Sequence, residues 1–426
     1  MQNAVMDELK EAGAAGNWEG AHKILKTALA HDDARSFVDA PMFNAALNVA
    51  AKRGKWRAAV GLMASMRKSG VNPTEVTYTL TMKACGDCGQ WAKALSLLRD
   101  MQMEGMIPNV KNYSSAIKAC SNGGQWKRVL SLLSEMRTEG VTPSHGTYNV
   151  AIKACEVGGQ WEQALSILGE IRRAGECPSI VAYDSAIKAC GKGRQWEQAL
   201  SLLSEMRTEG VAPDDSIYHT AIKVCGNCGQ WEQALSLMSQ MRRERLVPSR
   251  ITYHVAIATC GGERWKQALT LFDEMREEGV SPNASTYHKI IKTCVDGGQG
   301  EPVLTLWRDL NRESFSPLIE TFTYVIKVYG EYGQWEQTLS LLHTIRERGV
   351  VPDVETYSSV IKACATGGQW KCALSLLDEM RRDGVTPDVG TFTSVIKACK
   401  DGGQFEHASS LLTGIRREAS TPDTVG

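Results

Sequence analysis

The sequence predicts an all-α fold, an α-solenoid of about eleven stacked helical hairpins. Three observations predict it: an aromatic residue recurs every 35 residues, a tryptophan recurs between successive aromatics, and a proline closes each period. A fixed period of this length is typical of solenoids, in which each unit packs only against its neighbours. One continuous array therefore accounts for 426 residues that would otherwise suggest roughly two or three globular domains.

The three markers keep their spacing along almost the whole chain. The aromatic stands at Phe43, Tyr78, Tyr113, Tyr148, Tyr183, Tyr218, Tyr253, Tyr287, Phe322, Tyr357 and Phe392, and only the interval from Tyr253 to Tyr287 is 34 residues. The tryptophan stands at Trp56, Trp91, Trp126, Trp161, Trp196, Trp231, Trp265, Trp335 and Trp370, with Gly300 and Phe405 at the two remaining places. The proline occurs eleven times from Pro73 to Pro422.

Each period contains two amphipathic helices, as the stretch from Tyr183 to Asp214 illustrates. Apolar residues at the i, i+3, i+4, i+7 spacing predict the first helix: Tyr183, Ala186, Ile187 and Cys190. The same spacing predicts the second: Trp196, Ala199, Leu200, Leu203 and Met206. Gly191 and Gly193 are expected to form the turn between them. Gly210 is expected to end the second helix in a left-handed conformation, and Pro213 prevents its continuation.

The markers also divide the chain. Residues 1–39 are predicted to form a degenerate N-terminal capping hairpin, residues 40–423 an array of eleven repeats, and residues 424–426 the C-terminal end. The hairpin from Ala284 to Leu318 is the least regular, with Pro302 in the first turn of its second helix, where proline is tolerated. The first residues have neither an apolar signal core nor an Arg/Ser-rich, acid-poor transit segment.

Composition narrows the functional classes. Formal net charge is zero, so binding of a polyanion would have to come from local patterning of charge. No apolar run approaches the roughly 20 residues of a membrane span, and no membrane partner is expected.

Most of the 13 cysteines share one repeat position and are expected to pack in the core. They are Cys85, Cys120, Cys155, Cys190, Cys225, Cys260, Cys294, Cys364 and Cys399, with Tyr329 filling the place once. Two CxxC pairs, Cys85/Cys88 and Cys225/Cys228, lie four repeats apart and cannot converge on one zinc ion. We expect no metal and no cofactor, and so many thiols without a disulfide framework favour a reducing compartment.

The repeat resembles the pentatricopeptide repeat (PPR) family. The resemblance rests on 35-residue units such as VETYSSVIKACATGGQWKCALSLLDEMRRDGVTPD, with T-Y near the start and G-V-x-P-D at the end. It covers residues 40–423, and all units are of the plain 35-residue class without editing extensions. It implies a right-handed superhelix that binds single-stranded RNA, one nucleotide per repeat.

In this family two side chains are implied to recognise each base: the residue after the opening aromatic and the residue after the closing proline. We term these the base-recognition pairs. In this chain they are Asn44/Thr74, Thr79/Asn109, Ser114/Ser144, Asn149/Ser179, Asp184/Asp214, His219/Ser249, His254/Asn283, His288/Leu318, Thr323/Asp353, Ser358/Asp388 and Thr393/Asp423. By resemblance the first four imply a pyrimidine, adenine, a purine and cytosine, and the last three imply guanine. The resemblance implies no base for the four central pairs, so the implied site is 5′-YARCNNNNGGG-3′.

Two further positions bear on RNA affinity. The resemblance implies that Val or Ile two residues before the aromatic inserts between bases, which Val76, Val181 and Ile251 fit; Lys111, Gly146, Ser216, Ser285, Glu320, Glu355 and Gly390 do not. A row of lysines stands four residues after the base-recognition position: Lys83, Lys118, Lys153, Lys188, Lys223, Lys292, Lys327, Lys362 and Lys397. These ammonium groups either line the RNA groove and contact phosphates or are merely solvated. The Arg and Glu residues of the second helices are interpreted as a charged outer surface.

The residues leave more than one function open. Three histidines follow the aromatic and either contact a base or lie on a surface without function: His219, His254 and His288. Acid–base catalysis would need a second positioned group beside them, and none recurs there. The resemblance implies a non-enzymatic RNA-binding protein of a chloroplast or mitochondrion that acts in RNA processing, stabilisation, splicing or translation, with protein partners of an organellar RNA complex. The alternative is a protein-binding helical scaffold, which zero net charge and the seven unmatched insertion positions favour. An enzyme subunit without its catalytic domain has no support in the residues present.

Overall fold

The structure, a computed structural model, describes residues 2–30, 38–313 and 315–419. Within these residues it has 24 α-helices and one short 3₁₀-helix, and no strand. The predicted all-α repeat architecture is therefore confirmed, whereas the handedness of the superhelix stays a prediction. The chain divides into two compact units, Met1–Cys228 and Gly229–Gly426.

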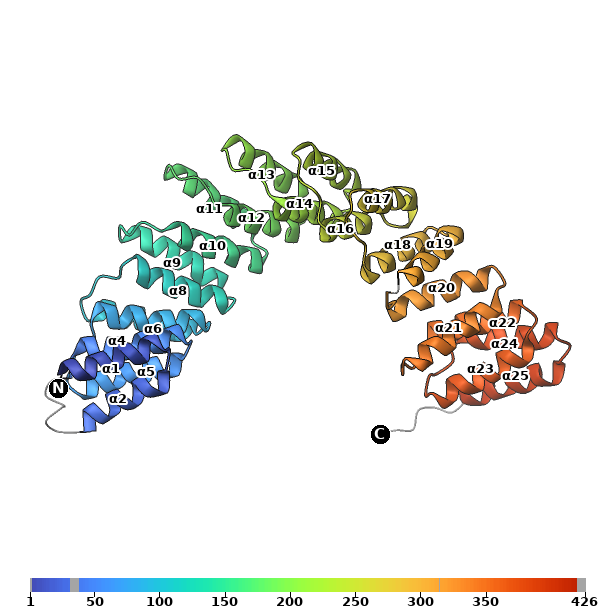
Figure 1. The fold of residues 1–426 in the computed structure, drawn as a ribbon, viewed down its shortest axis with the longest axis horizontal. Helices are drawn as coiled ribbons and strands as arrows, with labels where there is room; N and C mark the ends of the chain where they lie inside the picture. Colours follow the sequence, from blue (N-terminus) through green and yellow to red (C-terminus); the bar gives the residue numbers. More distant parts are fainter. Residues whose placement is uncertain (1, 31–37, 314, 420–426) are drawn as a thin grey trace. The chain divides into compact units, whose positions relative to one another are not determined.

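The first unit contains thirteen helices (Figure 1). They are α1 Gln2–Ala14, α2 Trp18–Ala30, α4 Ala40–Lys52, α5 Trp56–Lys68, α6 Glu75–Asp87, α7 Trp91–Met103, α8 Val110–Asn122, α9 Trp126–Thr138, α10 His145–Gly158, α11 Trp161–Arg173, α12 Ile180–Lys192, α13 Trp196–Thr208 and α14 Asp215–Asn227.

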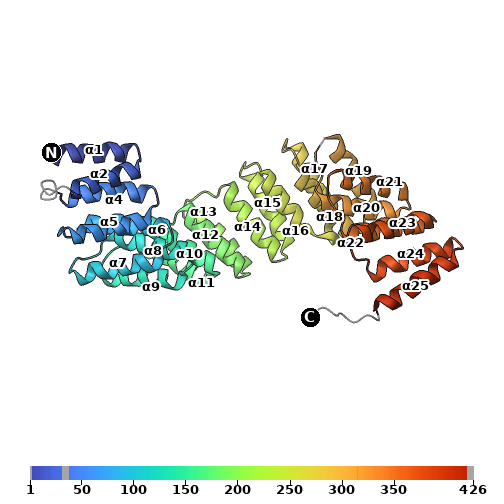
Figure 2. The same ribbon diagram turned by 90° about the horizontal axis from the view of Figure 1, so that it is seen from below.

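The second unit continues the same alternation of helices (Figure 2). It contains α15 Trp231–Arg243, α16 Arg250–Cys260, the 3₁₀-helix η1 Gly262–Arg264, α17 Trp265–Glu277, α18 Ala284–Asp296, α19 Gly300–Arg312, α20 Ile319–Glu331, α21 Trp335–Glu347, α22 Val354–Thr366, α23 Trp370–Arg382, α24 Val389–Asp401 and α25 Phe405–Ala419.

In each unit the helices form two layers. First helices pack on one another in sequence, α4 to α14 in the first unit and α16 to α24 in the second. Within each unit, a second helix packs on the first helix of its own hairpin, and most second helices also pack on the first helix of the next hairpin. Because the second helices cover only one side of the first-helix layer, the other side of that layer is available to a ligand.

The hairpin of α12 and α13 shows why the sequence folds this way. Tyr183 is the fourth residue of α12 and is fully buried, as are the other three apolar residues predicted for its inner face. On α13 the residues Ala199, Leu203 and Met206 are buried as expected. Leu202, absent from the predicted stripe, is buried as well, because this helix meets two first helices and therefore buries a wider face.

The turn between these helices differs from the expectation. Gly191 lies inside α12, and Gly193 ends it with a φ of −79°, so neither residue adopts a left-handed conformation. Arg194 adopts it instead, with a φ of 56°. Gly193 is needed for another reason: a Cβ there would collide with the indole of Trp161 in the preceding hairpin. Gly210 has the expected left-handed conformation, with a φ of 78°.

The irregular places fold without loss of the helical pairs. The hairpin that is one residue shorter differs at its turn: α16 ends early at Cys260, and the 3₁₀-helix η1 makes the connection to α17. In α19 Gly300 stands at the tryptophan position, and a Cβ there would collide with the ring of Tyr332 in the next hairpin. Trp307 of the same helix is buried and packs edge-on against Phe322. The N-terminal pair α1 and α2 packs on α4 and shares its apolar core, with Leu9 and Leu25 buried. Its role as a cap stays a prediction.

Candidate nucleic-acid interface

The residue after each closing proline caps the next first helix. Ser179 precedes α12 in an extended conformation, and its Oγ accepts a hydrogen bond of 3.2 Å from the backbone N–H of Ala182. This satisfies one of the N–H groups that a helix start leaves without a partner. The same arrangement occurs at Thr74, Asn109, Ser144, Asp214, Ser249, Asn283, Asp353 and Asp388. Leu318 has no capping side chain, and Asp423 lies outside the described residues.

The residue after the aromatic lies one turn into the first helix and is partly exposed in most hairpins. It contacts the residue that precedes the next aromatic, which we term the connecting residue. In one example Ser114 Oγ lies 2.7 Å from Thr147 Oγ1, and Ser144 Oγ lies 2.9 Å from the same hydroxyl. The two members of a base-recognition pair are thereby joined through a third side chain.

The structure brings most of the described pairs together in this way. Two pairs are bonded directly, Asn44 Nδ2 to Thr74 Oγ1 at 3.3 Å and Ser179 Oγ to Asn149 Oδ1 at 2.9 Å. Three more are joined by a connecting residue: Thr79/Asn109 through Asn112, Thr323/Asp353 through Thr356 and Ser358/Asp388 through Thr391. His288 Nδ1 lies 2.9 Å from the connecting Thr321, but its partner Leu318 has no polar group.

The connecting residues were missed by the sequence analysis. Thr77, Asn112, Thr147, Thr321, Thr356 and Thr391 are all buried polar side chains, and each bonds the residue after the preceding aromatic. Buried polar groups are stable when their hydrogen bonds are satisfied, which these contacts achieve. The recurring T-Y dipeptide could have indicated them. Hydrophobic burial explains the tyrosine but not the threonine beside it, so a recurring threonine indicates a recurring hydrogen bond.

The central repeats of the first unit differ from the rest. Asp184 accepts hydrogen bonds from Thr220 Oγ1 at 2.8 Å and from the ammonium group of Lys188. A cavity of about 560 Å³ opens beside them over α10, α12 and α14, and His219, Lys192 and Lys223 line it. His219 Nδ1 is buried without a hydrogen-bond partner. Burial, and then the charge of Lys223, lowers the pKa of His219, so the ring is neutral at pH 7.

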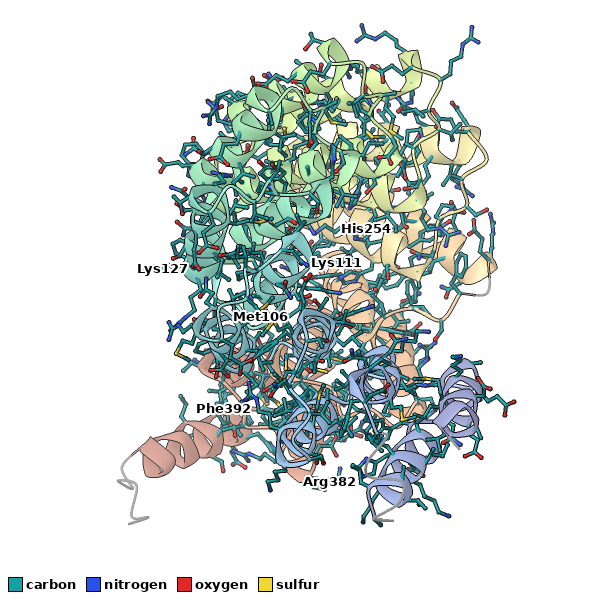
Figure 3. All side chains as sticks on the ribbon, turned by 90° about the vertical axis from the view of Figure 1, so that its left-hand side faces the viewer. Met106, Lys111, Lys127, His254, Arg382 and Phe392 are labelled. Carbon is teal, nitrogen blue, oxygen red and sulfur yellow. The ribbon has the colours of Figure 1, made fainter. Side chains whose placement is uncertain are left out.

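The insertion positions are exposed whatever residue they carry. Val76, Val181 and Ile251 are the second residues of α6, α12 and α16, and their exposed fractions are 54%, 58% and 64%. Lys111, labelled in Figure 3, is the second residue of α8 and is also exposed. Glu320 and Glu355 are exposed at the same place and bring negative charge to it. Insertion between bases stays a prediction for the three apolar residues.

The lysine row divides into two groups. Lys118, Lys153, Lys188 and Lys292 each form an ion pair, with Asp87, Glu156, Asp184 and Asp296 respectively. Lys83, Lys223, Lys327, Lys362 and Lys397 are exposed and have no ion-pair partner among the described residues. Only these five are therefore immediately available to a phosphate.

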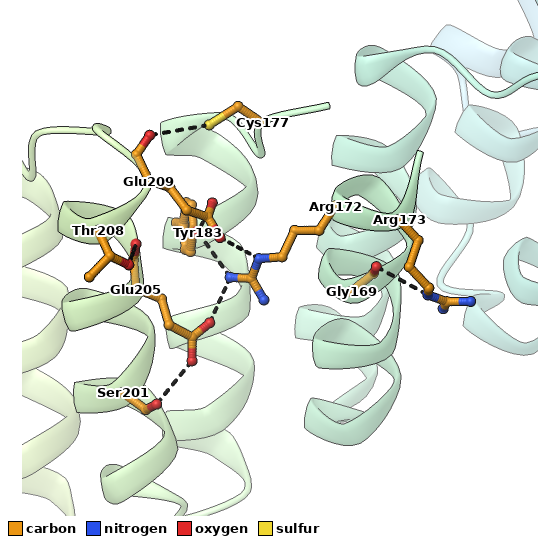
Figure 4. A network of polar contacts seen from close by, with 9 residues as sticks. All are labelled: Gly169, Arg172, Arg173, Cys177, Tyr183, Ser201, Glu205, Thr208 and Glu209. Atoms are coloured by element: carbon orange, nitrogen blue, oxygen red, sulfur yellow. Dashed lines mark hydrogen bonds and ion pairs between the residues drawn. The ribbon is translucent and has the colours of Figure 1, made fainter. Parts of the chain in front are cut away.

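The Arg and Glu residues of the second helices join neighbouring hairpins, which revises their interpretation as a mere outer surface. In Figure 4, Arg172 Nη2 donates to Tyr183 Oη at 3.0 Å and to Glu205 Oε2 at 2.6 Å, and Glu209 accepts from both Arg172 and Tyr183. Arginines reach the next hairpin's tyrosine in the same way at Arg67, Arg207, Arg242 and Arg346. These contacts stabilise the stacking of hairpins.

Most of the cysteines behave as core residues. The nine that share one repeat position are buried, and all 13 are free thiols. Among the residues that the structure describes, no group of three or more His, Cys, Asp or Glu side chains is placed to hold a metal ion. Over the same residues, no helix has the length and apolar character to cross a membrane.

Comparison with known families identifies the repeat. The pentatricopeptide repeat domain model matches residues 96–157, 265–297, 305–367, 340–404 and 375–425. The PPR repeat family model matches residues 38–87 and 178–227, and the PPR repeat model matches residues 76–106, 146–176 and 216–246. No curated protein sequence matches this chain.

The fold is shared with a solved structure. The pentatricopeptide repeat protein PPR10 from maize is 22% identical with a TM-score of 0.63, over 98% of this chain and 64% of that one. This chain thus spans less than two thirds of the maize protein. PPR10 in complex with an 18-nt psaJ RNA element gives a TM-score of 0.45 at 22% identity, over 97% and 69%. The PPR domain of Arabidopsis thaliana protein-only RNase P 1 in complex with tRNA gives 0.37 at 18% identity, over 42% and 94%.

Proposed function

This chain belongs to the pentatricopeptide repeat family, and we propose from that premise that it binds single-stranded RNA sequence-specifically, one nucleotide per hairpin. The observation that carries the proposal is the recurrence of a polar pair that is joined by hydrogen bonds in six hairpins, either directly or through a connecting residue. Side-chain pairs presented at a constant spacing suit readout of successive bases. The five lysines without ion-pair partners supply phosphate contacts that do not depend on sequence.

The finer parts of the proposal follow the family. Residues 40–423 form the RNA-binding array and residues 1–39 cap it. The protein acts without catalysis, by occupying about eleven nucleotides of a chloroplast or mitochondrial transcript, and thereby stabilises the RNA or prepares it for processing, splicing or translation. The lysines, the described base-recognition pairs and the three insertion residues have the roles that the sequence analysis assigns to them. Asp423 has the same proposed role, although it lies outside the described residues.

The test is fluorescence-anisotropy binding to 5′-CAACUUUUGGG-3′ and to the same RNA ending in CCC, titrated with salt. We expect tighter binding to the GGG ending, with affinity that falls as salt rises. Equal binding to both RNAs with a steep salt dependence would keep RNA binding and reject the base assignments. Absence of binding at low salt would reject RNA and favour the protein-binding scaffold.

A single substitution tests the assignment of one base. Asp353→Asn converts the Thr323/Asp353 pair into the Thr/Asn combination found at Thr79/Asn109, which the family resemblance assigns to adenine. Asparagine also caps helices, so the backbone at the start of α22 is retained. We expect the variant to prefer CAACUUUUAGG over CAACUUUUGGG, reversing the preference of the natural chain. An unchanged preference would contradict the one-base-per-hairpin assignment at this position.

A further inference from the structure

Two cysteines of one hairpin face each other. Cys364 is on α22 and Cys372 is in the first turn of α23, and their sulfur atoms are 3.7 Å apart. No other pair of cysteine sulfurs among the described residues makes such a contact. In the CxxC pair of α6, Cys88 Sγ donates instead to the carbonyl of Gly54 at 3.1 Å. The sulfur pair is thus confined to one hairpin of the array.

The sequence shows that this contact is an addition to the repeat. Cys364 belongs to the recurring row of core cysteines, whereas the position of Cys372, two residues after the tryptophan, carries glutamine in five hairpins: Gln163, Gln198, Gln233, Gln267 and Gln337. The α12–α13 hairpin therefore provides a matched case, with Cys190 in the core and Gln198 where Cys372 stands. Cysteine at both positions occurs only in the α22–α23 hairpin.

The two thiols have different environments. Cys364 is fully buried, whereas Cys372 is only half-buried and accessible to small solutes. Cys364 donates its S–H toward Cys372, and this hydrogen bond lowers the pKa of the Cys372 thiol. A partly exposed thiol of lowered pKa beside a second thiol is the arrangement found in oxidant-sensitive proteins.

We propose that Cys372 and Cys364 form a peroxide-reactive thiol pair, with Cys372 as the attacking residue and Cys364 as the resolving residue. The Cys372 thiolate attacks one oxygen of a hydroperoxide, the O–O bond breaks, and the leaving alkoxide or hydroxide takes a proton. Cys372 becomes a sulfenic acid, and the hydroperoxide is reduced to an alcohol or water. Cys364 then attacks the Cys372 sulfur, an S–S bond forms, and the sulfenic hydroxyl leaves as water with the proton of Cys364.

The geometry permits this closure. A disulfide requires about 2.0 Å between sulfur atoms, so the two side chains must approach by less than about 2 Å. Cys372 lies at the start of a helix on a side chain with free rotation about one bond, and Cys364 is already directed toward it. The product joins α22 to α23 within one hairpin. The proposal does not depend on RNA binding.

The full chain can be tested directly, because trypsin separates the two cysteines. Cleavage after Lys362, Lys371 and Arg381 gives the peptides 363–371 and 372–381, each with one cysteine. The reduced protein is treated with hydrogen peroxide at a few equivalents, remaining thiols are alkylated, and the non-reduced digest is analysed by mass spectrometry. We expect the 363–371/372–381 linked peptide to be the dominant disulfide. Its absence, with oxidation distributed over other cysteines, would overturn the proposal.

Three variants separate the roles. Cys372→Gln restores the residue of the other hairpins and should abolish the linked peptide with unchanged circular dichroism. Cys364→Ala should leave Cys372 as a sulfenic acid that a dimedone probe traps. Cys190→Ser, the control, should leave the amount of linked peptide unchanged. In the natural chain Cys372 should be alkylated by iodoacetamide at pH 7 about threefold faster than the exposed Cys177. Equal or slower alkylation of Cys372, or a linked peptide that survives Cys372→Gln, would contradict the assignment.

Discussion

Asp353 illustrates how one residue serves both the fold and the proposed function. Its carboxylate accepts a hydrogen bond of 2.8 Å from the backbone N–H of Thr356 at the start of α22. In the proposed function the same carboxylate recognises a base together with Thr323. Sequence reasoning assigned such residues to base recognition alone, although serine, threonine, asparagine and aspartate are also the residues that cap helices. The two roles are separable by substitution.

Asp353→Ala should destabilise the start of α22 by about 1 kcal/mol, because the cap is lost. Amide hydrogen exchange in α22 should then be roughly fivefold faster, since a tenfold change corresponds to about 1.4 kcal/mol. Asp353→Asn is the control and should change exchange by less than about twofold, because asparagine also caps. Equal acceleration in both variants would show that the carboxylate acts through something other than the cap.

The three histidines after the aromatic make stability depend on pH. Burial lowers the pKa of His219, His254 and His288 below the ordinary value of 6.5. The unfolded chain therefore takes up protons first as the pH falls. This contribution to stability is fully present above about pH 6.5 and is lost as the pH falls toward the folded pKa values. Urea midpoints at pH 7.5 and 5.5 measure it.

Replacement of all three histidines by asparagine should reduce the difference between these midpoints, because asparagine does not titrate. The carboxylates of the chain provide the background in both proteins. If the triple variant loses as much stability between pH 7.5 and 5.5 as the natural chain does, the histidines are not the source of the pH dependence.

Single residues were predictable where burial follows periodicity. Tyr183, Ile187 and Cys190 lie in the core as the i, i+3, i+4, i+7 spacing indicates. The connecting threonines were not found, because the pattern treats a hydroxyl as outward-facing and does not show that its hydrogen bonds are satisfied inside. The conformation of Arg194 was also missed, since sequence statistics place glycine in left-handed turns.

Among the first helices from α4 to α24, α20 is the one without a side-chain cap. Leu318 occupies the capping place in the same extended conformation as its counterparts, but its side chain accepts no hydrogen bond from the helix. Leu318→Asp should therefore stabilise α20 by about 1 kcal/mol, because it supplies an acceptor and a negative charge at the helix start. Slower amide exchange in α20 would confirm it.

Leu318→Ala is the matched control for this element and should not slow the exchange, because alanine removes the leucine without adding an acceptor. If Leu318→Ala also slows amide exchange in α20, the effect comes from removal of a partly exposed apolar side chain and not from the added acceptor. No change with aspartate would mean that the backbone at Leu318 cannot adopt the capping geometry of Asp353.

The start of the second helix follows from the sequence in most hairpins, because tryptophan marks it. The start of the first helix does not, since α12 begins at Ile180, before the predicted Tyr183. The 34-residue interval is a further difference. The sequence shows that one residue is missing, but not that α16 ends at Cys260 and that a 3₁₀ turn over Gly262–Arg264 makes the connection. A Cβ at Gly262 would collide with the backbone of Asp296 in the next hairpin, a close approach that the sequence does not reveal.

At the scale of the whole molecule, charge pairing determines how much of the lysine row contributes to RNA affinity. Lys327→Ala should reduce the slope of log affinity against log salt by about 0.7, the value for one phosphate contact of a single strand. Lys292→Ala should reduce it by less than half as much, because Lys292 is bonded to Asp296 at 2.7 Å. Anisotropy titrations with CAACUUUUGGG measure both slopes. Equal reductions would mean that the ion pair opens on binding.

The whole-molecule architecture was predictable because each repeat packs only on its neighbours, so the period alone defines the fold. The electrostatics were not. Lys118 pairs with Asp87 of the preceding hairpin, whereas Lys153, Lys188 and Lys292 pair with carboxylates three or four residues away on the same helix. Lys83, Lys327 and Lys397 also have a carboxylate four residues further along the chain, yet they form no ion pair among the described residues. Net charge and periodicity do not identify which lysines are paired.

The capping role of the residue after proline also limits how the target of such a protein changes over time. A helix start needs a short side chain that accepts a hydrogen bond, so this position is restricted to four residue types: Ser, Thr, Asn and Asp. Nine of the eleven hairpins have one of these four in a capping contact. The residue after the aromatic caps no helix, and in this chain it is Asn, Thr, Ser, Asp or His. New specificities should therefore arise first at the residue after the aromatic, which needs only a polar group for the connecting residue, whereas the residue after proline changes only among the four capping residues.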